Sequence, residues 1–244
     1  MSSATPSSMP SASPVPTANV KPPSADYDFR FGGLRRLYGQ RAAEAFRHAR
    51  RHNIYFAKEI PDLPADHPAL KMVETSNNTL CADQIAPSPL LRLYEWPEFA
   101  LFLAATMGRE KLHAMADPLA RVNVMSYSAG QTLNWHFDRA EFTVTLLLQA
   151  PDEGGAFEYR TDLRTAENPN YDGVAQLLEG ADPAMQTMHV TAGTLNVFRG
   201  VNTPHRVTPV KGTTPRMIAV LTYFEKQHVR FSASEQLGFY GRTA

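Results

Sequence analysis

The chain contains only one cysteine, Cys81, among its 244 residues. A lone cysteine excludes an internal disulfide framework and a cysteine-based zinc cluster, and it fits a reducing compartment. No apolar run approaches the roughly 20 residues that are needed to cross a bilayer. The N-terminus also lacks the apolar stretch of a secretory leader, and its first basic residue is Lys21. We therefore expect a cytoplasmic protein that has no membrane partner.

An excess of charge of either sign is also missing, because 24 basic residues balance 24 acidic ones. A chain of this kind has no overall attraction to nucleic acid, so we expect no nucleic-acid partner. Hydrophobic residues make up 43% of the chain, which is enough to build a core. The sequence leaves the oligomeric state open, a homodimer included.

The first part of the chain divides into a tail and a helical region. Residues 1–26 are rich in Ser, Pro and Ala, a composition that cannot bury enough apolar surface to fold, so they predict a disordered tail. Residues 27–244 form one predicted domain, whose front part, 27–117, is mostly helical. Within it, residues 29–51 place apolar side chains at helical spacing, and residues 53–60 resemble a short strand. Residues 87–108 have a helical pattern that Pro97 interrupts.

From about residue 118 to 226 the chain changes to short β-rich runs separated by Gly, Pro, Asn and Asp. This pattern predicts a mainly β fold, a double-sheet jelly roll with the N-terminal helices packed outside it. One insertion, about 161–186, separates two of the predicted strands and is expected to hold a short helix at 172–178. Long loops at the mouth of a barrel commonly act as lids, so we expect this insertion to be lid-like.

The stretch NWHFDRAEF, residues 134–142, carries the first candidate chemistry. His136 and Asp138 are two residues apart, so on a strand both side chains project from the same face. His205 begins another predicted strand. Two imidazoles and one carboxylate, without a thiolate, form the set expected of a facial triad, which binds Fe(II) and leaves positions open for substrate and O₂. We predict these three residues as metal ligands and catalytic residues.

Arg216 opens the next predicted strand, RMIAVLTY. A guanidinium inside a barrel needs an anionic partner, because an unpaired buried charge is very costly. A dicarboxylate co-substrate would supply that partner through a bidentate pair.

The segments WHFD, DEGGAFEY and GTLNVFRGVNTPHRVTPVKGTTPR together resemble the Fe(II)/2-oxoglutarate-dependent dioxygenase superfamily, over about residues 118–226. Within that superfamily, DPLARVNVMSYSAGQTLNWHFD and the upstream LRLYEW most resemble the standalone amino-acid halogenases and their hydroxylase relatives, the lysine halogenase group, over about 70–240. The resemblance implies a double-stranded β-helix fold with Fe(II), and with 2-oxoglutarate and O₂ as co-substrates. It implies that His136, Asp138 and His205 bind the iron and that Arg216 binds 2-oxoglutarate. Tyr127 and Thr145 are further candidate contacts of 2-oxoglutarate.

The halogenases of this group have a small residue where this chain has Asp138, and chloride fills the vacancy. The carboxylate here predicts hydroxylation, or desaturation or ring closure, in place of halogenation. The group acts on free amino acids, often cationic ones, but Arg139 follows Asp138 where an acid would suit lysine. A less polar or anionic amino-acid-like small molecule therefore fits better. The candidate substrate contacts are Arg121, Asn123, Asn134, Arg139, Thr222 and Tyr240.

Two other functions remain open at this point, and a third is disfavoured. A prolyl-hydroxylase-like enzyme would act on a peptide or protein side chain and would need an open groove. A non-catalytic cupin-like binding barrel would have no affinity for 2-oxoglutarate. A nucleic-acid demethylase is disfavoured by the balanced charge.

Overall fold

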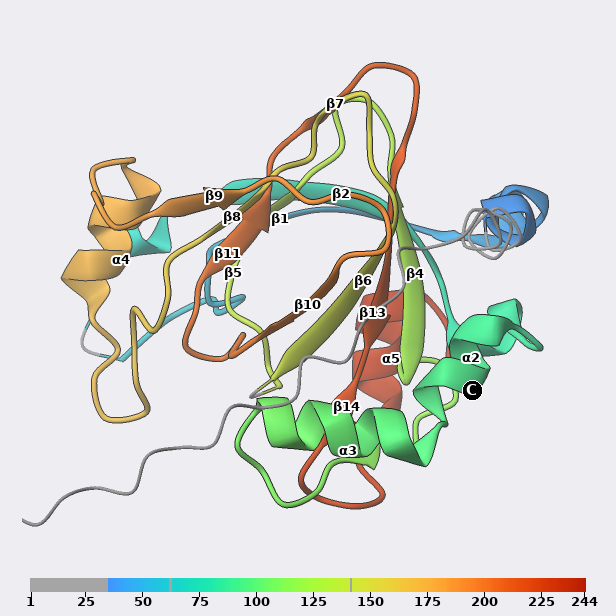
Figure 1. Cartoon of the computed structure of the whole chain (residues 1–244). Coiled ribbons are helices and arrows are strands. Elements are labelled where there is room, and N and C mark those ends of the chain that lie inside the picture. The colour runs from blue at the N-terminus through green and yellow to red at the C-terminus, as the bar shows by residue number, and fades with distance from the viewer. Residues whose placement is uncertain (1–34, 62, 141) are drawn as a thin grey trace, which may run out of the picture.

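The computed structural model describes residues 35–61, 63–140 and 142–244. The predicted tail, residues 1–26, lies outside the described residues. Two main antiparallel sheets face each other (Figure 1), which confirms the predicted jelly roll. The larger sheet has the order β1-β2-β4-β13-β6-β10, and the smaller sheet has the order β5-β11-β8-β9. Tyr127, Leu147 and Ile218 of the larger sheet form a small core with Leu133 of the smaller one.

The strand bounds follow the order of the sheets. The strands of the larger sheet are β1 (Phe46–His52), β2 (Val73–Leu80), β4 (Val122–Tyr127), β13 (Arg216–Leu221), β6 (Thr143–Gln149) and β10 (Leu195–Phe198). The strands of the smaller sheet are β5 (Leu133–His136), β11 (His205–Val207), β8 (Phe157–Tyr159) and β9 (Gln186–Met188). Two short ribbons pair β12 (Val210–Lys211) with β7 (Glu153–Gly154), and β14 (Tyr223–Phe224) with β3 (His113–Ala114).

Helices cover the outer face of the larger sheet. The predicted interruption at Pro97 is confirmed, because α2 (Pro89–Tyr94) ends before it and α3 (Pro97–Thr106) begins at it. Proline suits the first turn of a helix, where its missing N–H would have no partner. The largest core of the protein lies between these helices and the sheet. It includes Leu90, Phe99 and Leu103 from the helices and Val124, Leu146 and Ala219 from the strands.

The prediction of a mostly helical front part is wrong for two segments. Residues 35–41 are helical and the 3-10 turn η1 (Ala42–Glu44) follows, but the chain then enters β1 and later β2. Residues 53–60, predicted as a strand, form a loop. The sequence FRHARRH of β1 has no strong preference for a strand, and its conformation is set by seven paired positions with β2. Strand pairing of this kind is non-local and overrides weak helical propensity.

The insertion at 161–186 contains α4 (Tyr171–Leu178), which confirms the predicted helix. Val174 and Leu177 of this helix share a core with Trp135 and Phe137. These two aromatic residues alternate with His136 along the chain, so α4 packs on the face of the smaller sheet that is opposite to His136. Figure 1 shows α4 at the left of the molecule, beside β8 and β9. A lid function for the insertion stays a prediction.

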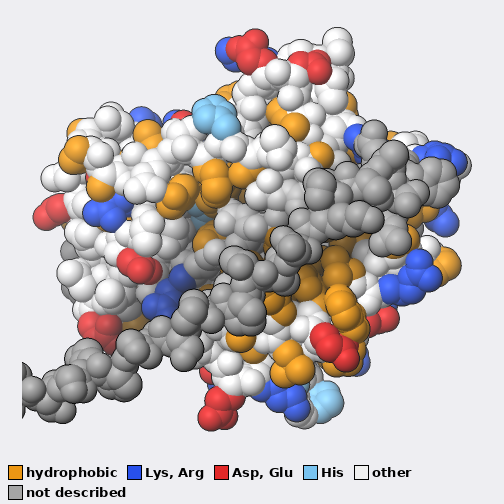
Figure 2. Space-filling view, viewed as in Figure 1, with side chains coloured by type: hydrophobic (Ala, Val, Ile, Leu, Met, Phe, Trp, Pro, Cys, Tyr) orange, Lys and Arg blue, Asp and Glu red, His pale blue; other side chains and the backbone are white. Residues whose placement is uncertain are grey.

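Among the described residues, no helix is long and apolar enough to cross a membrane. On the face shown in Figure 2, basic and acidic side chains both occur around the edge of the molecule. Hydrophobic side chains are also visible there, and Trp96, Leu101 and Phe102 at and within α3 are each more than half exposed.

Asp117 connects the start of β4 to the C-terminal helix α5 (Ala233–Tyr240). Its side chain has no solvent exposure. One carboxylate oxygen accepts hydrogen bonds from the backbone N–H groups of Leu119 and Ala120 at 2.9 and 2.8 Å. The other accepts from the Phe231 N–H at 3.1 Å and the Gln236 amide at 2.8 Å. The buried carboxylate of Asp117 therefore accepts hydrogen bonds from four donors.

We expect Asp117→Ala to lower the free energy of unfolding by about 3 kcal/mol or more, because each buried donor left without a partner costs about 1–3 kcal/mol. Urea denaturation of the variant and of wild type measures this difference. Asp66→Ala, at an exposed loop position, is the control and should stay within about 0.5 kcal/mol of wild type. Equal midpoints for the two variants would contradict the role of Asp117.

Candidate functional site

The two histidines of the predicted triad meet across the smaller sheet. β5 ends at His136 and β11 begins at His205, and these two residues are directly paired in the antiparallel register. Asp138 follows two residues after His136. Its Oδ1 lies 3.4 Å from His136 Nε2, and its Oδ2 lies 3.5 Å from His205 Nε2. One ligand atom from each residue lies within 4.8 Å of the others, so the group could hold one metal ion.

Hydrogen bonds on the far side of each imidazole orient the rings. His136 Nδ1 lies 2.8 Å from the carbonyl oxygen of Asn134, and His205 Nδ1 lies 3.0 Å from that of Thr203. A carbonyl oxygen only accepts, so each Nδ1 carries the proton and donates it. Each Nε2 then presents its lone pair toward Asp138. Donation of the second ring N–H to a carbonyl is the usual support of a metal-binding histidine.

The ionisation states of the group also suit a metal. Burial would raise the pKa of Asp138, but the adjacent imidazoles of His205 and His136 and the donating hydroxyl of Thr143 hold it well below its usual range. Burial lowers the pKa of His205 to about 4, and the attraction of Asp138 offsets only part of this effect. At neutral pH the site therefore combines an ionised carboxylate with a neutral His205, the forms that bind a divalent cation.

Gly200 makes room for the carboxylate. The Asp138 N–H donates to the Gly200 carbonyl at 3.0 Å. A Cβ on Gly200 would lie 2.1 Å from Asp138 Oδ2 and 2.7 Å from Thr143 Oγ1. Only glycine leaves this space empty, so the loop after β10 sets the position of the carboxylate.

Arg216 lies at the start of β13, opposite Tyr127 of β4. Its side chain is 2% exposed, and its Nε and Nη1 are buried without a hydrogen-bond partner among the described residues. Its Cζ lies 5.8 Å from the centre of the Tyr127 ring. Two unsatisfied donors on a buried cation indicate a missing anion.

A small cavity adjoins Arg216. Thr145 and Asn196 supply polar side chains to its wall, and Phe157 supplies an aromatic one. The Phe157 ring lies 5.5 Å from the ring of His205. Phe157 thus lies between this cavity, which Arg216 lines, and one of the three candidate ligands. The predicted cofactor set, Fe(II) with 2-oxoglutarate and O₂, fits this combination of a His-Asp-His group and a buried cation.

Most predicted substrate contacts are engaged within the protein. Arg121 forms an ion pair with Glu95 at 2.8 Å, and Arg139 forms one with Glu235 of α5. The Tyr240 hydroxyl donates to the Asn123 side chain at 2.8 Å.

The remaining two candidates also have partners in the fold. The Thr222 hydroxyl donates to the carbonyl of Ala120 at 3.3 Å. Asn134 donates to the carbonyl of Glu74 at 3.3 Å, and its own carbonyl orients His136. Their roles as substrate contacts stay predictions.

Two wall residues of the site were missed by sequence reasoning. Asn196 faces the cavity from β10, where it pairs with Thr145. An Asn inside a strand pattern was the available indication, since Asn is depleted in strands. Phe56 lies 6.3 Å from the ring of His136, in the loop after β1. It belongs to residues 53–60, which were predicted as a strand but form a loop, so its position could not be predicted.

The two facing antiparallel sheets, the His-Asp-His group and the buried guanidinium define an Fe(II)/2-oxoglutarate-dependent oxygenase fold. The sequence makes the assignment narrower, since the family described as Halogenase D matches residues 70–237, more than half of the chain. The protein belongs to this family. No curated protein matches the chain.

Solved structures share this fold at low sequence identity. AviO1 from Streptomyces viridochromogenes Tue57 is 15% identical, with a TM-score of 0.53, and the match covers 84% of this chain and 87% of AviO1. An oxidoreductase of the 2OG-Fe(II) oxygenase family from Burkholderia pseudomallei is 13% identical, with a TM-score of 0.48, over 84% of this chain and 92% of that one. The likeness to AviO1 supports the fold alone.

We expect Gly200→Ala to weaken metal binding at least about 10-fold, because the new Cβ displaces the carboxylate, and even a supporting partner of a metal ligand contributes 10–100-fold to affinity. Anaerobic titration with Fe(II) measures the loss. Gly238→Ala is the matched control, since a Cβ there, in α5, meets nothing within 4 Å. Wild-type iron affinity in Gly200→Ala would contradict the assigned position of Asp138.

We expect Arg216→Leu to raise the dissociation constant of 2-oxoglutarate by about 30-fold or more, since removing one member of a buried charge pair costs about 2–5 kcal/mol. The visible charge-transfer band of the anaerobic Fe(II) protein, titrated with 2-oxoglutarate, gives the constant. Lys211→Met removes an exposed cation on nearby β12 and should leave it unchanged. An unaltered constant in Arg216→Leu would remove this residue from the 2-oxoglutarate site.

Proposed function

We propose that the protein is an Fe(II)/2-oxoglutarate-dependent oxygenase that hydroxylates a free amino acid or a related small metabolite. Desaturation and ring closure are variants of the same hydrogen abstraction. The single observation that supports this proposal is the position of Asp138, whose two oxygens lie 3.4 and 3.5 Å from the two imidazole Nε2 atoms. A carboxylate there takes the place that the resemblance to the halogenases assigns to chloride.

The residues have separate tasks in this proposal. His136, Asp138 and His205 hold Fe(II) on one side, and Arg216 binds the distal carboxylate of 2-oxoglutarate. Tyr127 and Thr145 stand beside that carboxylate, one on each strand that neighbours β13. When bound, Fe(II) with 2-oxoglutarate and O₂ supplies the oxidant that removes a hydrogen atom from a C–H bond. Hydroxylation places one oxygen atom of O₂ in the product and the other in succinate, with release of CO₂.

Phe157 and Phe198 keep water away from one side of the centre. Their rings lie 5.5 and 4.7 Å from the ring of His205. Exclusion of water protects a reactive oxidant from side reactions and directs it to the bound substrate. Thr143, by donating to Asp138, fixes the rotamer of the one ligand that is not on a strand.

A panel of metabolites tests the proposal. The protein with Fe(II), 2-oxoglutarate and O₂ is incubated with free amino acids in one set and with proline-containing peptides in another, and succinate is measured. Substrate-dependent succinate with a product heavier by one oxygen supports hydroxylation, whereas a loss of two hydrogens indicates desaturation or cyclisation. Turnover of peptides alone supports the prolyl-hydroxylase-like alternative. Absence of a charge-transfer band with Fe(II) and 2-oxoglutarate supports the cupin-like binding barrel.

We expect Asp138→Gly to lower hydroxylated product by more than about 100-fold, because a direct ligand contributes more than the supporting partners that cost 10–100-fold. Product masses recorded with added chloride or bromide measure the loss, and weak halide transfer is the most that the vacancy allows. Asp66→Gly, at an exposed position, should keep the wild-type yield. Unchanged hydroxylation in Asp138→Gly would overturn the ligand assignment.

A further inference from the structure

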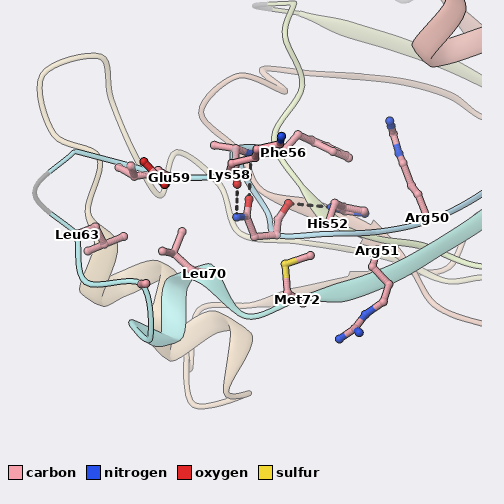
Figure 3. A pocket seen from close by; sticks show the side chains of 13 residues that line it. Arg50, Arg51, His52, Phe56, Lys58, Glu59, Leu63, Leu70 and Met72 are labelled. Atoms are coloured by element: carbon pink, nitrogen blue, oxygen red, sulfur yellow. Dashed lines mark hydrogen bonds between the residues drawn. The ribbon is translucent and has the colours of Figure 1, made fainter.

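Arg50, near the C-terminal end of β1, is a second cation on the side of the metal group. Arg50 and Arg51 are neighbours on this strand, and Figure 3 shows that their side chains point to opposite sides of it. The Arg51 side chain is 69% exposed and lies 4.0 Å from Glu74. Arg50 points to the side of Phe56, with its Cζ 4.6 Å from the centre of the Phe56 ring. The two arginines therefore have different surroundings although they are adjacent in sequence.

Arg50 is held by aromatic rings and not by an acid. Its Cζ also lies 5.6 Å from the ring of Phe239 on α5. In the parts of the chain that the structure describes, no carboxylate pairs with it, and the residue is exposed. The group stays protonated under all ordinary conditions. A guanidinium that is held between two rings and open to solvent, without a counter-charge, can form a bidentate pair with a carboxylate ligand.

Phe56 places this cation beside the metal group. The Phe56 ring stacks on His52 at 4.1 Å and lies 6.3 Å from the ring of His136. Phe56 has a φ of 54°, a left-handed conformation that is rare for an aromatic residue and marks a constrained position. Arg50 and His136 thus both lie near the ring of Phe56.

A pocket of about 540 Å³ opens at this point. The size is in the range of small-molecule sites, which are commonly 300–1,000 Å³. Its described lining includes three cations, Arg50, Arg51 and Lys58, and one acid, Glu59. His52, also in the lining, has a lowered pKa because of burial, and both its ring nitrogens have partners, the Asn53 carbonyl and the Thr75 hydroxyl. The excess of positive charge favours an anionic ligand.

We propose that Arg50 binds the carboxylate of the substrate, with Phe56 and Phe239 holding the guanidinium in place. This inference rests on the proposed function and adds the group by which the substrate is recognised. A bound carboxylate at Arg50 directs the rest of a short molecule past Phe56 toward the three metal ligands. Residues within a peptide are disfavoured by the same contact, because their main-chain carboxyl groups are in amide bonds.

Calorimetry under anaerobic conditions tests the proposal with the protein loaded with Fe(II) and saturated with 2-oxoglutarate, so that Arg216 is occupied. The probes are the twenty standard L-amino acids and their carboxamides, which lack the carboxylate. We expect at least one acid to bind. Its carboxamide should bind at least about 30-fold more weakly. Succinate release with the same probes then separates KM from kcat.

Three variants locate the effect. Arg50→Gln keeps much of the side-chain length without the charge, and it should raise the dissociation constant and KM of the acid by about 30-fold while leaving the carboxamide unchanged. Arg50→Lys should be intermediate, since an ammonium cannot form the bidentate pair. Arg47→Gln is the matched control, since Arg47 is an exposed cation on the same strand that does not line the pocket, and it should match wild type. Succinate release without substrate, and the charge-transfer band, should be unchanged in all three.

The outcomes separate this proposal from the proposed function. Equal affinity for acids and carboxamides, equal losses in the Arg50 and Arg47 variants, or no binding of any acid by wild type would each overturn the role of Arg50. The charge-transfer band would persist in those cases, and the oxygenase function would stand. A wild-type protein that gives no such band would instead overturn the proposed function.

Discussion

The arrangement of the protein around its centre depends on one cross-strand pair. His136 and His205 face each other where β5 meets β11, with ring centres 4.1 Å apart, and the carboxylate of Asp138 reaches both Nε2 atoms. Burial keeps the imidazole of His205 uncharged, and the hydroxyl of Thr143 donates to the ionised carboxylate of Asp138. The fold therefore prepares the protonation states that a divalent cation requires before any cation is bound. A shift of one residue in this register would turn one imidazole to the opposite face.

The two sheets contribute different parts of the site. The smaller sheet supplies both imidazoles, and its opposite face is fixed by the packing of Trp135 and Phe137 against α4. The larger sheet supplies Arg216 and Thr145, and β1 at its edge supplies Arg50. This division explains why Asp138 lies just beyond a strand end. Only there can one carboxylate reach both imidazoles while its backbone is held by Gly200.

The part of the site that local pattern determines was predictable. The two-residue spacing of His136 and Asp138 defines a shared face on any strand, and Arg216 opens a strand with a clear β pattern. The proline-bounded helices were predictable because proline fixes where a helix begins. β1 was not predictable, since its seven residues acquire strand geometry only from pairing with β2. On a helix Arg50 and Arg51 would share one basic surface, whereas on a strand they separate, and only one of them faces Phe56.

Among the described residues, two guanidinium groups without acidic partners lie on different strands of the larger sheet. Arg216 is almost fully buried at the start of β13, whereas Arg50 is exposed and lies between two rings on β1. A deeply buried cation suits a co-substrate that is the same in every reaction cycle, and a more open one suits a substrate that must enter and leave. The chain has no net charge, so neither cation reflects a generally basic protein. Their positions, on an inner strand and on the edge strand of the larger sheet, fit the 2-oxoglutarate and the substrate carboxylate proposed above.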